Sequence, residues 1–103
     1  MVCVAAGGGH VCAAISDGGV YCVGENSSGQ LGNRKTTESF KPVQVEGLDE
    51  NVISVVANFD FTCALTGNGK VMCWGNNNVG QLGNGTKESS SVPVEVIGLE
   101  IGN

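Results

Sequence analysis

A unit of 51 residues occurs twice in this chain of 103 residues, with no insertion or deletion between the copies. Residues 1–51 align with residues 52–102, and twenty of the 51 paired positions are identical. Most of the identical residues are glycine, cysteine, proline or small apolar residues, which set the shape of the backbone. A tandem period of this length is typical of repeat architectures, in which each unit buries its apolar face against a neighbour. The repeat therefore predicts two stacked units, residues 1–51 and 52–103.

Each unit contains four short apolar stretches that end at turns. The expected strands cover residues 2–6, 10–15, 19–24 and 42–46 in the first unit, and 53–57, 61–66, 70–75 and 93–97 in the second. Seventeen glycines and valine-rich runs favour short strands with tight turns, and no sustained helical spacing of apolar residues is present. The fold class is therefore all-β: two four-stranded antiparallel blades of a β-propeller, which form an incomplete ring in one chain.

The cysteine spacing predicts the register of the second and third strands. If Cys12 lies opposite Cys22, the loop between the strands has three residues and ends on Gly18, which suits the left-handed backbone of such a turn. The same spacing holds for Cys63 and Cys73, with a glycine at the same place. Directly opposed residues of an antiparallel pair lie close enough for a disulfide. We expect two disulfides and hence an extracellular, cell-surface or periplasmic location, the alternative being buried free thiols.

The remaining cysteine and the single histidine have plain structural interpretations. Cys3 aligns with Ser54 and has no internal partner, so it is either a core thiol or part of a disulfide to another blade or chain. Cys3, His10 and Cys12 resemble a ligand set, but a structural zinc needs four ligands and Cys12 is better used against Cys22. We therefore predict no metal, no cofactor and no catalytic residues.

The charge of the chain excludes one class of partner. The formal net charge is −5, and the only basic residues are Arg34, Lys35, Lys41, Lys70 and Lys87. A nucleic-acid-binding protein needs a basic stripe to neutralise phosphates, and these five residues do not form one. The longest apolar run is only a few residues, so no transmembrane helix is expected. Protein partners, without nucleic acid or membrane, are the expectation.

The long polar loops at residues 25–41 and 76–92 are the expected places for contact with a partner, because loops on a rigid scaffold vary most freely. The residues proposed for such contact are Arg34, Lys35, Phe40 and Trp74, although Trp74 is more readily a core residue. The loops also contain the glycosylation sequons at Asn26 and Asn84. Within them, Gly29-Gln30-Leu31-Gly32 and its copy at residues 80–83 predict a shaped turn with its leucine plugging the blade and its glutamine bonding backbone groups.

Several short motifs together resemble one known family. They are Val55-x-Ala57, Thr62-Cys63-Ala64-Leu65, the run from Gly69 to Asn76, the run from Gly80 to Gly85, and Pro93-Val94. The chain resembles, over its whole length, the regulator-of-chromosome-condensation repeats, and in particular their cysteine-bearing extracellular and bacterial relatives. The first copy departs at Val23, where the second has Trp74, and at residues 7–9, where three glycines replace Asn-Phe-Asp.

The resemblance implies a ring of four-stranded blades, commonly seven, used mostly as a platform for binding proteins. Two blades cannot close a ring, so identical chains stacked head to tail would form a homo-oligomer or, if the rotation did not close, a filament. Blades of a longer chain are the other source of neighbours. We therefore expect a non-enzymatic, extracellular structural or protein-binding module. The alternatives are a nucleotide-exchange regulator of a small GTPase and an inhibitor of an extracellular enzyme.

Overall fold

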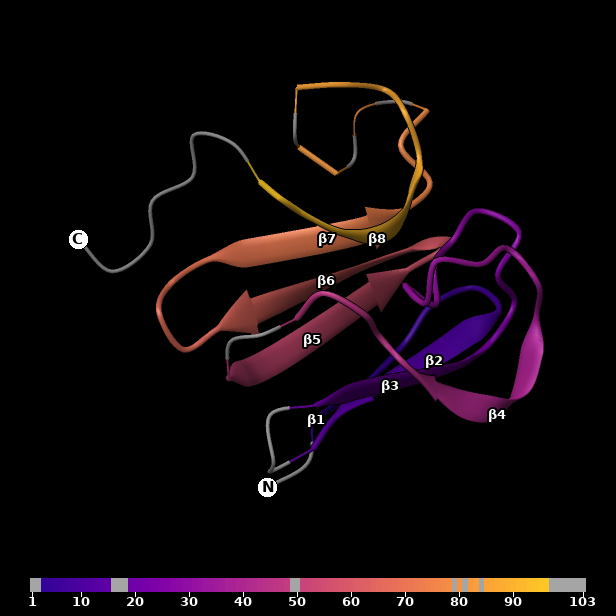
Figure 1. Ribbon diagram of the computed structural model, residues 1–103, viewed down its shortest axis with the longest axis horizontal. Coiled ribbons are helices and arrows are strands. Elements are labelled where there is room, and N and C mark those ends of the chain that lie inside the picture. Colours follow the sequence, from indigo (N-terminus) through magenta and orange to yellow (C-terminus); the bar gives the residue numbers. More distant parts are fainter. Residues whose placement is uncertain are drawn as a thin grey trace.

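The computed structural model describes residues 3–15, 19–48, 51–78, 80, 82–83 and 85–96. Its first sheet contains β1 (Cys3–Ala6), β2 (His10–Ala14), β3 (Val20–Gly24) and β4 (Ser39–Gln44). Its second sheet contains β5 (Val52–Asn58), β6 (Phe61–Thr66), β7 (Val71–Gly75) and β8 (Ser90–Glu95). Each sheet is an antiparallel meander in which the strands pair in chain order, and the two sheets lie beside each other (Figure 1). The predicted all-β class with two four-stranded blades is confirmed.

The hairpin register follows the cysteine spacing. Cys12 pairs with Cys22 across β2 and β3, and Cys63 pairs with Cys73 across β6 and β7. In the second hairpin Gly69 has φ +90°, the left-handed backbone that the three-residue loop was expected to need. The corresponding turn of the first hairpin, residues 16–18, lies outside the described residues.

The fourth strand of each sheet begins three residues earlier than predicted. β4 begins at Ser39 and β8 at Ser90, so Pro42 and Pro93 lie inside the strands rather than at their starts. Proline is tolerated there because each strand forms the edge of its sheet and needs no donor on its outer side. A bulge between Cys22 and Gly24 aligns β4 with β3, and the second sheet repeats it. The predicted end of the last strand, at Ile97, is outside the described residues.

The hydrophobic core lies between the two sheets. Alternation along a strand places His10, Cys12 and Ala14 on one face of β2. This face packs against β5 and against Thr62 of β6, whose buried face also carries Ala64 and Thr66. The buried apolar residues that form the core are Cys12, Ala14, Val20, Cys22, Leu31, Val45, Val52, Val55, Ala64 and Trp74. The interface between the sheets is therefore the main hydrophobic layer of the described structure.

Candidate functional site

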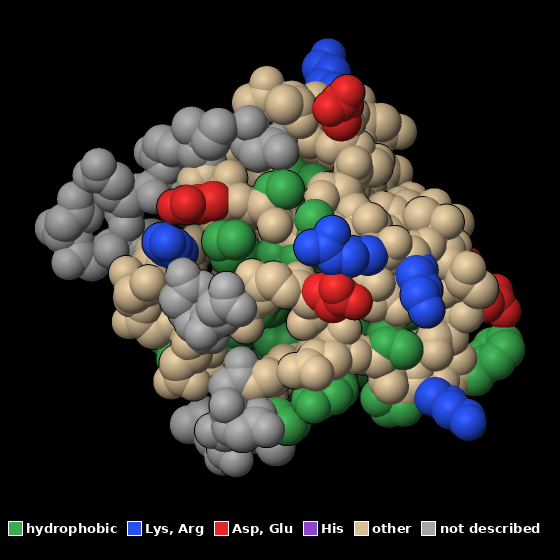
Figure 2. All heavy atoms as spheres, viewed as in Figure 1, with side chains coloured by type: hydrophobic (Ala, Val, Ile, Leu, Met, Phe, Trp, Pro, Cys, Tyr) green, Lys and Arg blue, Asp and Glu red, His purple; other side chains and the backbone are tan. Residues whose placement is uncertain are grey.

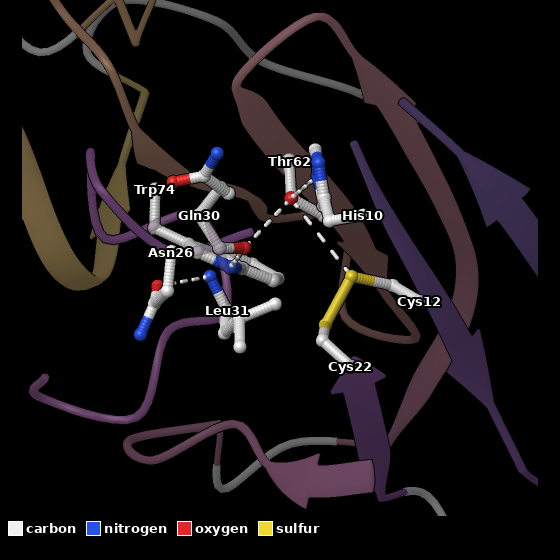
Figure 3. The surroundings of a disulfide bond; sticks show 8 residues. All are labelled: His10, Cys12, Cys22, Asn26, Gln30, Leu31, Thr62 and Trp74. Carbon is white, nitrogen blue, oxygen red and sulfur yellow. Dashed lines mark hydrogen bonds between the residues drawn. A yellow bond between two sulfur atoms is a disulfide. The ribbon is translucent and has the colours of Figure 1, made fainter. Parts of the chain in front are cut away.

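A small polar cluster joins the two sheets inside their apolar interface (Figure 3). Thr62 Oγ1 donates to the backbone carbonyl of Gln30 at 3.0 Å, and the indole Nε1–H of Trp74 donates to the same carbonyl at 2.9 Å. His10 Nε2 lies 2.8 Å from Thr62 Oγ1. All four residues are at most 2% exposed. The two sheets and the loop after β3 are therefore joined by hydrogen bonds that are shielded from water.

The directions of these hydrogen bonds decide the tautomer of His10. Because the Thr62 hydroxyl donates to Gln30, it accepts from the imidazole, so Nε2 of His10 carries the proton. The other ring nitrogen, Nδ1, has no hydrogen-bond partner among the described residues. It lies against Gly7, where a Cβ atom would come within 2.9 Å of Nδ1. The glycine makes room for the ring, and burial of Nδ1 disfavours a second proton there, so the neutral ring fits the cluster best.

Burial lowers the pKa of His10 below its usual value of 6.5, while the carboxylates of Asp60 and Glu25 and the backbone of Phe61 act in the opposite direction. The unfolded chain therefore binds a proton on His10 at a higher pH than the folded chain does. Stability from the neutral ring is fully present above pH 6.5 and is lost as the pH falls below it toward the folded pKa.

We expect the wild type to lose more stability on acidification than His10→Phe, a variant that copies the phenylalanine at the aligned position of the second repeat. The excess loss approaches about 1.4 kcal/mol per pH unit where the proton uptake of the two states differs most. Urea unfolding at about pH 7.5 and about pH 5.5 measures it. Equal losses in the two proteins would show that His10 does not control this dependence.

The four repeat cysteines are joined in two disulfides, Cys12–Cys22 and Cys63–Cys73. The first lies in the interface, with Cys12 Sγ 3.9 Å from Thr62 Oγ1 (Figure 3). Cys3 is in neither disulfide and is half-buried, with its Sγ 3.8 Å from the hydroxyl of Ser54 in the other sheet. The expected pairing is thus the pairing that the structure contains, and Cys3 lies at the junction of the blades.

The sequon residue Asn26 is a buried structural residue. Its Nδ2 donates to Oδ1 of Asn33 and to the carbonyls of Lys35 and Thr37, and its Oδ1 accepts the backbone N–H of Leu31. The folded structure therefore contradicts glycosylation at Asn26, because a glycan would occupy the nitrogen that makes these bonds. The second sequon, at Asn84, lies outside the described residues.

The second copy contains the same loop anchor one repeat later. Asn77 Nδ2 donates to the carbonyls of Thr86 and Glu88, and its Oδ1 accepts the N–H of Leu82. Leu31 and Leu82 are both fully buried, as expected of residues that plug the blades. Gln30 bonds through its backbone carbonyl, and its Oε1 also accepts the N–H of Ser28. Gln81 lies outside the described residues.

Three of the four predicted contact residues are on the surface. Arg34 pairs with Glu46 at 2.9 Å, both side chains being exposed; Lys35 is exposed; and the Phe40 side chain is 86% exposed. The prediction of contact at Trp74 is wrong, because its indole is fully buried and packs between the blades. Figure 2 shows acidic and basic side chains spread over one face of the molecule, with hydrophobic side chains reaching the surface among them.

Each sheet has a second face that the other sheet does not cover. In the second sheet a shallow hollow of about 90 Å³ is lined by Ser54, Val55, Val56, Cys63, Ala64, Leu65 and Val71. This face, called here the Phe61 face, carries Phe61, Cys63 and Leu65 at the positions that His10, Cys12 and Ala14 hold in the first sheet. In the first sheet the open face is the one opposite His10, Cys12 and Ala14. This face is called the Val11 face, and it carries Val4, Val11, Ala13 and Val23. Val4 and Val11 are 63% and 41% exposed.

The polar cluster is the feature that sequence reasoning missed. A signal for it was available, because His10 aligns with Phe61 and Val11 aligns with Thr62, so the copies exchange polarity at two adjacent positions.

No group of three or more potential metal ligands exists among the described residues. None of the described segments forms a helix with the length and apolar character needed to cross a membrane.

Comparison with family models gives matches over most of the chain. Two models, each described as the Regulator of chromosome condensation (RCC1) repeat, match residues 1–30 and 52–81, and residues 17–65 and 68–101. The chain is 29% identical over 98 residues to the human (Homo sapiens) E3 ubiquitin-protein ligase HERC2, covering 90% of this chain and 2% of that protein. It is 39% identical over 88 residues to Protein RCC2 homolog of Danio rerio, covering 82% and 18% respectively.

Solved structures have the same arrangement of strands. Human WBSCR16 superposes with a TM-score of 0.80 at 31% identity, covering 89% of this chain and 24% of that one. Prp20p from Saccharomyces cerevisiae, whose structure was described with its binding properties to Gsp1p and histones, superposes with a TM-score of 0.76 at 26% identity. That match covers 97% of this chain and 26% of Prp20p. The chain thus spans about a quarter of each solved protein and less than a fifth of both curated relatives.

Proposed function

Because this chain belongs to the regulator of chromosome condensation repeat family, we propose that it is a non-enzymatic, protein-binding segment of a β-propeller. Its two blades stack head to tail with further blades, here those of a second copy. The observation that carries this proposal is the pair of uncovered apolar sheet faces. An exposed face of that kind is an association surface in a soluble protein.

The two open faces are complementary because each is the repeat copy of one of the two faces that pack together inside the chain. The Phe61 face corresponds to the face of the first sheet that packs on the second, and the Val11 face corresponds to the face that receives it. Docking the Phe61 face of one chain on the Val11 face of another therefore repeats the geometry already seen inside the chain. A head-to-tail contact of this type gives a closed ring or an open filament, depending on the rotation.

Protein partners beyond the blades would contact the long loops. Arg34, Lys35 and Phe40 supply exposed charge and an exposed aromatic ring on a rigid support. The binding of Prp20p to Gsp1p and histones, both protein partners, supports a protein-binding role for this chain. The ligase among the relatives shares only 2% of its length with this chain, so its activity is not carried over.

An extracellular or cell-surface location, or a periplasmic one, completes the proposal. Its support is the pair of disulfides at equivalent positions of the two blades, because such bonds persist in oxidising compartments and are rare in the cytosol. Inside a reducing compartment the same four cysteines would be thiols and the two hairpins would lose their cross-links.

Native mass spectrometry of protein alkylated before purification tests both parts. We expect assemblies of three or four chains, or a ladder of sizes, and alkylation of Cys3 alone until a reductant is added. A folded monomer at all concentrations would contradict stacking. Alkylation of all five cysteines in protein from its natural source would contradict an oxidising location. Deleting the aromatic ring with Phe40→Ser should leave the assembly mass unchanged if this residue serves outside partners.

A further inference from the structure

The two interfaces available to a blade differ at one polar contact. Inside the chain His10 of the first sheet meets Thr62 of the second, and both are buried. On the open faces the same two positions hold Phe61 and Val11. The repeat thus contains one polar pair and one apolar pair at equivalent places. Both members change together, so each pair is chemically matched.

Mixed pairs would leave buried polar groups without partners. A His10 face packed on a Val11 face would bury the imidazole N–H without an acceptor. A Phe61 face packed on a Thr62 face would leave the Thr62 hydroxyl without the imidazole N–H from which it accepts. The cost of a buried unpaired polar group is much larger than the gain from the bond itself, so a mismatch is penalised strongly.

Trp74 adds to the same discrimination. Its indole N–H and the Thr62 hydroxyl both donate to the Gln30 carbonyl, so the second sheet satisfies this acceptor twice. The aligned residues of the first sheet are Val23 and Val11, whose side chains donate nothing. The loop after β3 is therefore matched to the second sheet as its neighbour and would lose both donors against another first sheet.

We propose that the His10–Thr62 contact determines which blade faces pack together. The His10 face takes the Thr62 face, and the Phe61 face takes the Val11 face of a second copy. The blades then alternate in a fixed order, first with second, and two first sheets do not pair in this way. The choice of a second copy rests on the head-to-tail stacking proposed above and on continuity with the interface inside the chain.

A double-mutant cycle inside one chain tests the polar pair without requiring association. The variants are His10→Phe, Thr62→Val and both together, and the measurement is the equilibrium constant of unfolding in urea, taken with dilute protein. Thr62→Val should raise that constant by about tenfold or more, since it leaves the buried N–H of His10 unpaired, and His10→Phe should raise it by less, since the Thr62 hydroxyl keeps its bond to the Gln30 carbonyl. The double variant, which copies the Phe61–Val11 pair, should be raised by clearly less than the product of the two. Additive effects would overturn the pairing rule.

A second cycle on the open faces tests the occupant. The variants are Phe61→His, Val11→Thr and both together, and the measurement is the self-association constant by analytical ultracentrifugation. Each single change should weaken association by about tenfold, and the double variant should recover most of the loss. The control is Phe59→Asn, which removes an exposed aromatic ring from the β5–β6 turn, where its φ of +43° suits asparagine.

The two cycles separate the possible failures. Association that is indifferent to Phe61 and Val11 overturns the proposed occupant even if chains associate. Absence of association in the wild type overturns both the stacking and the second copy as occupant, whereas the cycle inside the chain still decides whether His10 selects Thr62. Coupling in both cycles supports the whole rule.

Discussion

Replacing Trp74 by alanine lowers the free energy of unfolding by about 3–5 kcal/mol, the largest single effect expected in this protein. The indole is fully buried between the sheets, and its N–H donates to the Gln30 carbonyl, so the change removes both packing and a hydrogen bond. It also leaves space beside Gly32, where an added Cβ would lie within 2.8 Å of the indole nitrogen. Urea unfolding followed by circular dichroism measures the loss.

Val23→Ala is the matched control for Trp74→Ala. Val23 holds the aligned position in the first sheet but lies on the open face, half-buried, so truncating it should cost less than about 1 kcal/mol. Trp74→Phe serves if the alanine variant does not fold. It keeps an aromatic ring and loses the N–H, and should cost about 1–2 kcal/mol. Equal costs for Trp74→Ala and Val23→Ala would mean that the two sheets do not pack on each other as described.

Replacing Asn26 by alanine lowers the free energy of unfolding by about 3 kcal/mol, the second largest expected effect. The side chain joins four groups of its own loop, and removing it leaves the N–H of Leu31 and three acceptors without that partner. Asn26→Asp has the same shape and should be comparably destabilising at neutral pH, because a carboxylate replaces a donor among carbonyl oxygens. Thermal and urea unfolding measure both.

Asn78→Ala is the control for the loop. Asn78 is exposed, and its backbone N–H bonds the side chain of Asn76, so the truncation should change stability by no more than about 0.5 kcal/mol. Asn77→Ala, at the position aligned with Asn26, should behave like Asn26→Ala. If Asn26→Ala were as mild as Asn78→Ala, the loop would not depend on the buried amide, and the argument against a glycan at that nitrogen would lose its basis.

Much of the fold could be predicted because its signals are local. The register of each hairpin follows from two cysteines ten residues apart and a glycine between them, and turns with left-handed glycine have few alternatives. The start of β4 was harder to predict from the sequence. Proline at residue 42 suggests a strand start, but the strand continues back to Ser39 since its outer edge requires no donor. Edge position is a property of the sheet and not of the segment.

The roles of polar residues were harder to predict. Asn26 has the sequence context of a modified surface residue, and its burial depends on carbonyls up to 11 residues away. Trp74 and His10 take their roles from the other unit, 44 and 52 residues distant from their partners. A single copy of the repeat contains no sign of these contacts, although the exchange of polarity between the copies does mark the positions of His10 and Thr62.

The amino-acid sequence by itself determined the two units, their four-stranded content, the opposition of the cysteines and the membership of the family. These properties depend on periodicity and on short spacings, which act before the sheets meet. Only the tertiary structure decided which face of each sheet is covered, which polar groups are buried with partners and which apolar faces stay open. The physical reason is that side chains alternate strictly across a strand, so the pattern defines two faces but cannot say which one a neighbouring sheet will occupy.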